Sequence, residues 1–503
     1  MSRSTSVTAA AATSFLGHAP RWYALAVVGL LAFNVPLYGL AGPVTTAWVI
    51  LAEFIFTLAM ALKCHPLAPA GLVALEAVLL GLATPEQVYR ETLHGFPVIL
   101  LLVFMVTAIY FMRELLLDLF SRVLTRVRSP VLLAFLFCAV AALLSAFLDA
   151  LTVLAVIITV AAGFYRVYFR VAAGLAGAND GEVEGESGIP PERLPELGRF
   201  RAALRGLLMH AAVGTALGGV CTLVGEPQNL LIGHAMGWDF RAFFAAMAPV
   251  SMPVLGAGLF TCVVLERLRW FGFGEPIPAG VRRVLVEFER TEAARRTPRD
   301  RWRLFVQGLC ALVLVAALAL HVAEVGLIGL MVVVLLAALD GISEEHRLAE
   351  GFKAAMPFTA LLVVFFAIVA VIDAQSLFTP VLGQVLALSG RAQLGALYLV
   401  NGILSAVSDN VFVATIYLAE VQRAFEAGTV TRGQFEALAV AINTGTNIPS
   451  VATPNGQAAF LFLLTSSVAP LIGLSYGRMV WMALPYFVVM TLVGLVSVMT
   501  LTG

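Results

Sequence analysis

Two short stretches, LSAFLD at residues 144–149 and LSAVSD at residues 404–409, repeat each other 260 positions apart. Each places one carboxylate, Asp149 or Asp409, in the middle of an apolar segment. A second block, Gly214-Thr215, Val220, Thr222 and Gly225, is answered in order by Gly445-Thr446, Val451, Thr453 and Gly456. Duplicated membrane chains with ionisable and Gly/Pro-interrupted segments at matching places are typical of secondary transporters, whose site lies between the repeats. The duplication therefore predicts a transporter of this kind.

The composition is that of a membrane protein. Hydrophobic residues make up 60% of the 503 residues and charged residues only 12%, whereas soluble domains are about 25% charged. Many apolar runs approach the roughly 20 residues that span a bilayer. The formal net charge is zero and gives no indication of a nucleic acid partner. The five cysteines lie singly, without metal-ligand spacing. We therefore expect an all-α polytopic membrane protein without a cofactor.

Charge distribution suggests how the chain crosses the bilayer. Basic residues cluster at 113–128, 166–205 and 267–303, and short loops rich in Lys and Arg lie on the cytoplasmic side. The apolar stretch 130–165 must then leave the cytoplasm and return to it. Two full crossings with a turn need roughly 40 residues, so we expect a re-entrant hairpin with Asp149 near its tip. Two short tilted helices are the alternative.

The rest of the chain predicts that the two repeats are inverted. Apolar runs indicate five crossings between the first hairpin and Asp409, and an odd number places the second hairpin on the opposite face. We expect about 11 transmembrane helices plus two re-entrant hairpins in inverted-topology repeats. The predicted organisation is a cytoplasmic N-terminus (1–21), a first half (22–266) with hairpin 130–165 and broken helix 206–236, a cytoplasmic loop (267–303), and a second half (304–503) with hairpin 393–420 and broken helix 435–468.

Smaller features complete this topology. The first spans are expected near 22–40, 43–63, 67–83 and 97–112. The amphipathic segment 114–128 is expected to lie in the membrane interface. The segment 171–200 is rich in Gly, Glu and Pro and is expected to be a flexible loop.

Carboxylates at bilayer depth are the first candidates for ion binding. An unpaired charge there costs about 2.5 kcal/mol or more, so such residues are rare and usually functional. Asp149 and Asp409 are each central in a hairpin and match each other; a structural cap of the hairpin turn is the simpler alternative. A carboxylate in low dielectric favours the protonated form, and a bound cation favours the ionised form. Na⁺ and H⁺ would then compete for one group.

The broken helices are the second candidates. Segments 214–229 and 443–457 interrupt apolar runs with Gly, Pro, Thr and Asn. Proline frees an upstream carbonyl, and carbonyl, Asn and Thr oxygens suit alkali cations. Kinks whose polar groups bond to neighbouring helices are the alternative. Glu226 is the third intramembrane carboxylate of interest.

Several segments together resemble the NhaB-type bacterial Na⁺/H⁺ antiporters of the ion transporter superfamily. They are AEFIFTLAMALK (52–63), SAFLDALTV (145–153), GTALGGV (214–220), VGEPQNL (224–230), SDNVFV (408–413) and AINTGTNIPSVATPNGQAAFLFLLTS (441–466). The resemblance runs nearly end to end, and the last segment is the most specific.

The resemblance implies a multi-pass protein of the bacterial inner membrane that exports Na⁺ and Li⁺ electrogenically in exchange for H⁺. Relatives in the superfamily, which include divalent-anion carriers, place polar motifs at two hairpin tips and two unwound helices, and many are homodimers. By position these places are 145–150, 214–229, 405–410 and 443–457. The anion carriers lack carboxylates at the tips, so Asp149 and Asp409 favour a cation as the transported species.

Our hypothesis from the sequence is a Na⁺/H⁺ antiporter in which these two aspartates bind Na⁺ or protons in turn. The remaining ligands are expected from Glu226, Asn410, Asn443, Thr446, Asn447 and Asn455. A Na⁺-coupled carrier of a small anion on the same fold is the alternative, although no Arg or Lys lies deep among the expected spans. An intramembrane enzyme would need a nucleophile–base pair or metal cluster that the scattered Cys and His do not offer, and a channel would not need two occluding hairpins.

Overall fold

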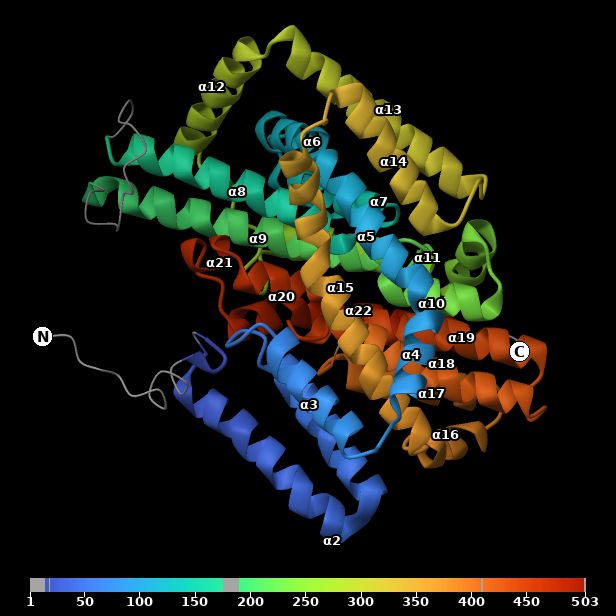
Figure 1. The fold of residues 1–503 in the computed structure, drawn as a ribbon. Coiled ribbons are helices and arrows are strands. Elements are labelled where there is room, and N and C mark those ends of the chain that lie inside the picture. The colour runs from blue at the N-terminus through green and yellow to red at the C-terminus, as the bar shows by residue number, and fades with distance from the viewer. Residues whose placement is uncertain (1–13, 18, 175–189, 409, 502–503) are drawn as a thin grey trace, which may run out of the picture.

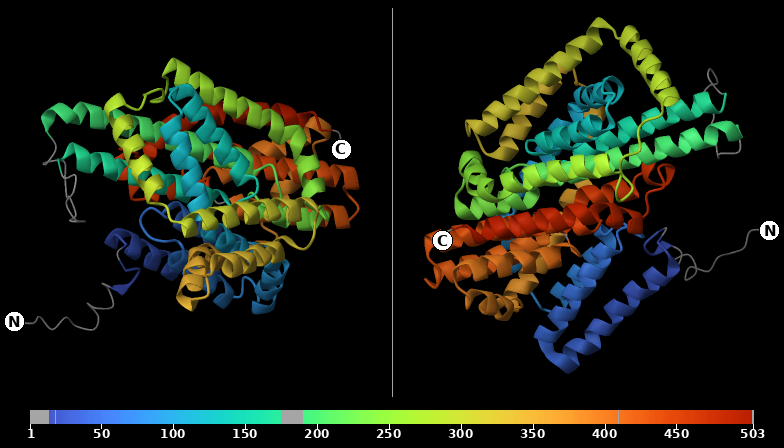
Figure 2. Two further views of the ribbon diagram at one scale, coloured as in Figure 1. Left: turned by 90° about the horizontal axis from the view of Figure 1, so that it is seen from above. Right: turned by 180° about the vertical axis from the view of Figure 1, so that it is seen from behind.

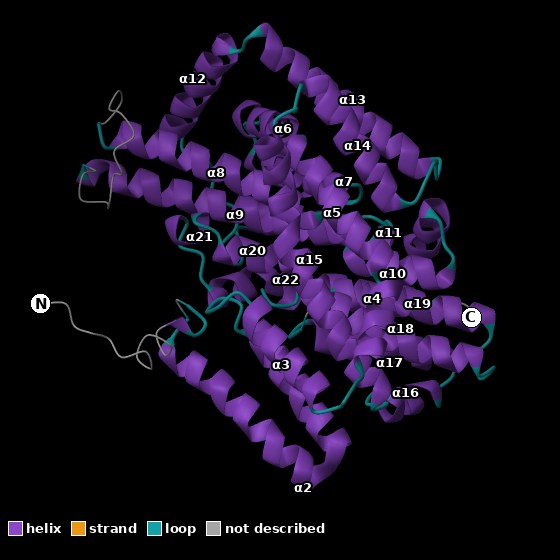
Figure 3. Ribbon diagram, viewed as in Figure 1, coloured by secondary structure: helices purple, strands orange, loops and turns teal. Residues whose placement is uncertain are grey.

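The chain folds into helices throughout (Figure 3). The computed structural model describes residues 14–501 except 18, 175–189 and 409, and no strand occurs in that part of the chain. Figure 1 shows the helices in chain order. The predicted all-α class is confirmed.

Six helices are long and apolar enough to cross a membrane. They are α2 (Arg21–Ala59), α8 (Ala150–Ala172), α11 (Phe240–Leu268), α13 (Pro298–Ala319), α15 (Glu345–Ala374) and α22 (Tyr476–Met499). A seventh span results if α4 (Pro85–His94) and α5 (Phe96–Phe111), which meet at a 54° bend, count as one. Shorter apolar helices are α3 (Leu67–Leu79), α7 (Pro130–Ser145) and α14 (Val325–Asp340). The chain is polytopic, and the count of about eleven spans stays a prediction.

The first two expected spans are two arms of one bent helix. Helix α2 runs from Arg21 to Ala59, but Gly42 has φ 79° and ψ 175°, which is not helical. Only glycine adopts such a positive φ without strain. The arms therefore join at Gly42 without a loop, and the second arm ends before the expected residue 63.

The two repeats have the same order of elements. The first consists of α7, α8, α9 (Leu194–Gly219) and α10 (Pro227–Met236). The second consists of α17 (Gly390–Ser405), α18 (Asn410–Glu426), α19 (Arg432–Asn447), a 3-10 turn η3 (Pro449–Ala452) and α20 (Ala458–Thr465). In Figures 1 and 2 the C-terminal end of α8 and the N-terminal end of α9 lie on the opposite side of the molecule from the α18–α19 connection. This arrangement is the one expected of inverted repeats.

Each hairpin packs closely against the broken helix of its own repeat. A side chain at Gly214 on α9 would overlap the backbone of Cys138 on α7. A side chain at Gly445 on α19 would lie 2.7 Å from the carbonyl oxygen of Tyr398 on α17. Both residues of each pair match those of the other by position, and small residues permit such close helix contact in membranes. The duplication therefore extends to individual helix contacts.

The two repeats also interlock. Helix α10, which follows the first break, packs against α18 of the second hairpin, and α20, which follows the second break, packs against α8 of the first hairpin. Each hairpin thus lies between the broken helix of its own repeat and the broken helix of the other. This exchange brings the hairpin tips and the breaks to the middle of the fold.

The remaining helices surround this core. Helix α15 packs against α3, α4 and α5, and α22 packs against α11 and α17. The amphipathic segment forms α6 (Arg113–Arg126), and the expected cytoplasmic loop 267–303 contains α12 (Ala279–Arg295). Of the expected loop 171–200, residues 175–189 lie outside the described part, and its end forms a 3-10 turn, η2 (Pro191–Arg193), and the start of α9. Short helices α16 (Thr379–Leu386) and α21 (Val468–Leu471) complete the chain.

Candidate ion-binding site

Asp149 caps the second helix of the first hairpin. Its carboxylate accepts hydrogen bonds from the backbone N–H of Thr152 (3.0 Å) and from the Thr152 hydroxyl (3.2 Å). Asp is a favoured N-cap residue, and the N-terminus of a helix stabilises negative charge. The structural role that the sequence left open for Asp149 is therefore real, and it fixes the carboxyl group at the hairpin tip.

Glu226 lies in the break of the first repeat and, like Asp149, directly precedes a helix. It precedes Pro227, the first residue of α10, and it is buried. The break itself is closed by Asn229, which donates to the carbonyl oxygens of Gly219 (2.7 Å) and Thr222 (2.6 Å). Asn229 thereby satisfies two of the carbonyls that the break releases from helical bonding.

Asp149 and Glu226 face the same small cavity. Its volume is about 10 Å³, and Asn410 and Gln228 also line it. The walls are completed by Ala150, Leu151, Pro227, Phe358, Val411 and Ala458. A cavity of this size holds about one water molecule, and it would likewise admit one cation without its hydration shell. The N-termini of four helices, α8, α10, α18 and α20, meet there.

Gln228 is a site residue that the sequence analysis did not single out. Its side chain is fully buried, yet neither its amide oxygen nor its amide nitrogen has a hydrogen-bond partner among the described residues. A buried amide without partners is costly unless a ligand or water satisfies it. The signal was a polar residue inside an apolar segment, next to the more conspicuous Glu226.

Asn410 joins the cavity from the second hairpin. The Ser405 hydroxyl bonds to the Asn410 amide and to the carbonyl oxygen of Thr446 (2.6 Å). The Asn410 amide fits best with its nitrogen directed at the carbonyl oxygens of Gly456 (2.7 Å) and Thr446 (3.0 Å). Its oxygen then points away from these acceptors, so we expect this oxygen to be available to a cation.

Three other predicted ligands lie in the second broken helix but do not line the small cavity. The Thr446 hydroxyl donates back to Ile442 (2.9 Å) within its own helix, as in the alternative reading of a kinked helix. Asn443 directs its nitrogen at the sulfur of Met247 (3.4 Å), and Asn447 accepts a bond from Gln457 (3.2 Å). The amide oxygen of Asn443 and the amide nitrogen of Asn447 are buried and have no hydrogen-bond partner among the described residues.

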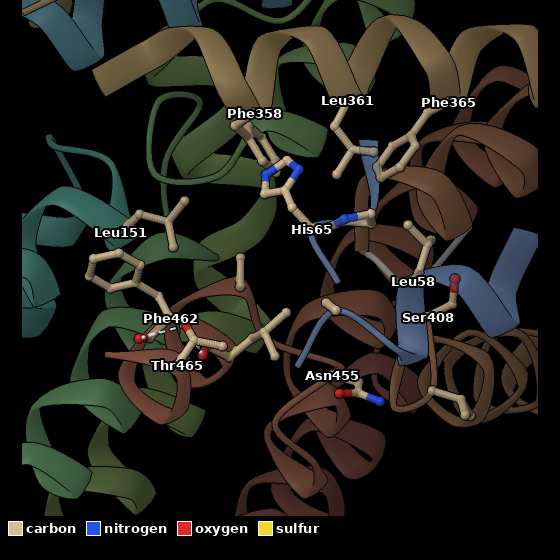
Figure 4. A pocket seen from close by; sticks show the side chains of 15 residues that line it. Leu58, His65, Leu151, Phe358, Leu361, Phe365, Ser408, Asn455, Phe462 and Thr465 are labelled. Carbon is tan, nitrogen blue, oxygen red and sulfur yellow. Dashed lines mark hydrogen bonds between the residues drawn. The ribbon is translucent and has the colours of Figure 1, made fainter. Parts of the chain in front are cut away.

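Two predicted residues remain. Asn455 lines a second cavity of about 240 Å³ that shares the side chains of Leu151, Phe358 and Ala458 with the small one. Figure 4 shows Ser408 and Asn455 on one side of this larger cavity and Leu151 on the other. Its walls are mostly apolar, and it lies beside the small cavity. Asp409 lies outside the described residues.

Each hairpin tip is tied to the break of its own repeat by one threonine. The Thr222 hydroxyl donates to the carbonyl oxygen of Ala146, and the Thr453 hydroxyl donates to that of Ala406. The tip and the break of one repeat are therefore a single hydrogen-bonded unit.

Comparisons with known proteins agree with the architecture. A sequence profile described as "Bacterial Na+/H+ antiporter B (NhaB)" matches residues 3–502. A protein named Na(+)/H(+) antiporter NhaB from Pseudomonas fluorescens is 62% identical over 491 residues, which are 98% of either chain. Proteins of the same name from Pseudomonas entomophila and Pseudomonas aeruginosa are also 62% identical, over 97% of either chain.

Proposed function

This chain belongs to the NhaB family of bacterial Na⁺/H⁺ antiporters, and we propose that it exchanges Na⁺ for H⁺ at the cavity between Asp149 and Glu226. The observation that carries the proposal is the convergence of two carboxylates and two amides, from three helix N-termini, on space for one ion. Oxygen atoms of carboxylates and amides are the ligands that hard cations prefer.

Exchange follows from competition for the carboxylates. Na⁺ binds the ionised groups, and protons displace it by neutralising them, because ligands must be deprotonated to hold a metal ion. The helix N-terminus and the two bonds from Thr152 stabilise the ionised form of Asp149. Two carboxylates that take up two protons or one Na⁺ would move net charge in each cycle, which gives an electrogenic exchange. Li⁺, which favours the same oxygen ligands, would be a second substrate.

Movement of the hairpins would expose the cavity to each side in turn. The repeats interlock through α10 with α18 and α20 with α8, and transporters with inverted repeats alternate access by moving one part against another around a fixed site. The larger cavity beside Phe358 is the proposed route to one side of a bacterial inner membrane. We place Asn455, which lines this cavity, along this route. Asp409, which matches Asp149 by position in the sequence, is proposed as a further ion-binding carboxylate. Homodimer formation, expected from the resemblance, stays a prediction that native mass spectrometry tests.

The anion-carrier alternative has less support. A cavity of about 10 Å³ lined by two carboxylates would repel a small dicarboxylate and is too small for it. The relatives compared above are named antiporters.

The test is Na⁺-dependent collapse of a proton gradient in everted membrane vesicles, followed with a pH-sensitive dye. The wild type should collapse the gradient when NaCl is added, and Asp149→Asn should not. The matched control is Asp239→Asn, because Asp239 caps α11 through the backbone N–H of Ala242 (2.7 Å) just as Asp149 caps α8. Asparagine is also a good N-cap, so both variants should fold.

Two outcomes would contradict the proposal. Collapse that persists in Asp149→Asn would leave the exchange but remove Asp149 from the site. Absence of Na⁺-dependent collapse in the wild type at every pH tried would reject the exchange itself.

A further inference from the structure

Two carboxylates outside the repeats share one buried amide. The Asn34 side-chain nitrogen donates to Glu53 (2.7 Å) and to Glu76 (2.8 Å). Asn34 and Glu53 lie on the two arms of α2, and Glu76 lies on α3. Because both carboxylate oxygens bond to one nitrogen, they lie within about 5.5 Å of each other. This group lies midway along the arms of a helix that has the length and hydropathy of a membrane span.

Asn34 and Glu53 are buried, Glu76 is partly exposed, and the hydrogen bonding of the trio is incomplete. Asn34 is fully buried and Glu53 is 4% exposed. The second oxygen of Glu53 and the amide oxygen of Asn34 have no hydrogen-bond partner among the described residues. A buried carboxylate oxygen without a donor is costly as an anion, so Glu53 requires a donor that the surrounding side chains do not supply.

The neighbouring helices provide no opposite charge near the trio. Glu76 is the only titratable group on α3, and α15 has none between Lys353 and Asp373. The other titratable groups of α2 are Arg21 at its start, Tyr23 and Tyr38. Tyr417 of α18 lies across a groove on the far side of the second arm of α2. Neither Glu53 nor Glu76 forms an ion pair with a basic residue in the described ranges.

Two like charges so close together at bilayer depth cannot both remain ionised without a cation. The geometry disfavours Na⁺, because the Asn34 nitrogen, a donor, is directed at both carboxylates where a metal ion would lie. If the amide were turned, its oxygen would face both carboxyl groups, and either two protons or one cation among the three oxygens would be needed. The orientation in the structure, in which the amide nitrogen donates to both carboxylates, requires a proton.

We propose that Glu53, Glu76 and Asn34 form a second proton-binding site, separate from the cavity at Asp149, which holds a proton at neutral pH. Glu53 lines the wall of an open, mostly apolar groove of about 720 Å³ along α2, so the site borders a space that opens to the outside of the protein. The next residue, Phe54, packs its ring against that of Phe412 at 5.4 Å, two residues after Asn410. The site therefore adjoins the second hairpin.

The test is infrared spectroscopy of the purified protein, which detects the carbonyl stretch of a protonated carboxyl group and its shift in D₂O. The wild type should show such a band at neutral pH, and Glu53→Gln with Glu76→Gln together should remove it. Each single variant should lose its band at a pH lower by about one unit or more, because the like charge is gone. Asp373→Asn is the control, since Asp373 is an exposed carboxylate paired with Arg423 (2.8 Å).

Three results would overturn the proposal. They are the absence of a protonated carboxyl band in the wild type, an unchanged band in the double variant, and loss, on adding Na⁺ at constant pH, of the part of the band that the double variant lacks. The last would make the trio a Na⁺ site. Thermal unfolding of each variant in detergent identifies any that is misfolded, and a single variant that folds then takes the place of the double variant.

Discussion

Thr222 donates a hydrogen bond to the carbonyl oxygen of Ala146, which joins the break after α9 to the tip of the first hairpin. Thr453 and Ala406 form the same bond in the second repeat. Both bonds lie where a helix has just ended, so each threonine satisfies a carbonyl that has lost its helical partner. The tip that carries Asp149 is therefore positioned by the break that carries Glu226.

Loss of this bond should weaken both the fold and transport. Thr222→Val leaves the Ala146 carbonyl without its partner, which costs about 1–3 kcal/mol for a buried group, and Thr453→Val should cost a similar amount. Thermal unfolding in detergent and vesicle transport both measure the effect. Thr159→Val is the control, because the exposed Thr159 hydroxyl bonds only to Ala155 in its own helix (2.8 Å). Equal unfolding temperatures for Thr222→Val and Thr159→Val would contradict a stabilising role for the bond from Thr222 to Ala146.

Much of the fold could be predicted because the duplication marks its special places. The matching of Asp149 with Asp409 located both hairpins, and the Gly, Pro and Asn clusters located both breaks. The bend of α2 at Gly42 was not predicted, since a glycine and two prolines in an apolar run fit a loop as well as a bend. Some helices also end a few residues from the expected positions, because the residues at their ends fit a helix and a loop equally well.

The site was predicted in part. Asp149, Glu226 and Asn410 meet at one cavity, as expected of the hairpin tips and the first break. Asn443 and Thr446 lie in the right segment but bond elsewhere. The direction of a side chain around a broken helix depends on the irregular backbone of the break, which periodicity does not give.

The close contact between α7 and α9 provides a stability prediction. A Cβ at Gly218 would overlap the carbonyl oxygen of Ala142, so Gly218→Ala should force the helices apart and cost about 1–3 kcal/mol, as overpacking does. The unfolding temperature should fall. Gly163→Ala is the matched control, because a Cβ at Gly163 on α8 meets nothing within 4 Å. That variant should be neutral or slightly stabilising, as alanine is the better helix former.

Gln228 should contribute to Na⁺ binding. Gln228→Leu removes an amide oxygen from the cavity, and a bond to a charged group is worth about 1.5–3 kcal/mol. The Na⁺ concentration for half-maximal exchange should rise about tenfold or more, since 1.4 kcal/mol is a factor of ten. Gln375→Leu, which removes an amide bonded to Leu82 (2.9 Å) away from the cavity, should leave that concentration unchanged. The same value in both variants would exclude Gln228 as a ligand.

One difference between the two breaks should be revealed by the pH dependence of transport. Glu226 corresponds to Gln457, whose amide nitrogen bonds to Ser450 (2.8 Å) and to Asn447 instead of facing the cavity. The first break thus adds a second carboxylate beside Asp149. If Na⁺ displaces a proton from each, the half-saturating Na⁺ concentration should fall by about two powers of ten per pH unit on the acidic side. The sign follows because higher pH ionises the ligands.

Glu226→Gln leaves one fewer proton to displace. The slope of log half-saturating Na⁺ concentration against pH should therefore drop by about one, with weaker Na⁺ binding at high pH, where the remaining ligands are ionised. Glu436→Gln, which removes an exposed carboxylate paired with Arg432 (2.8 Å), should retain the wild-type slope. Dye measurements in everted vesicles over a range of pH and NaCl give all three slopes. An unchanged slope in Glu226→Gln would mean that Glu226 stays ionised or stays protonated throughout the cycle, because only a group that exchanges its proton for Na⁺ contributes to the slope.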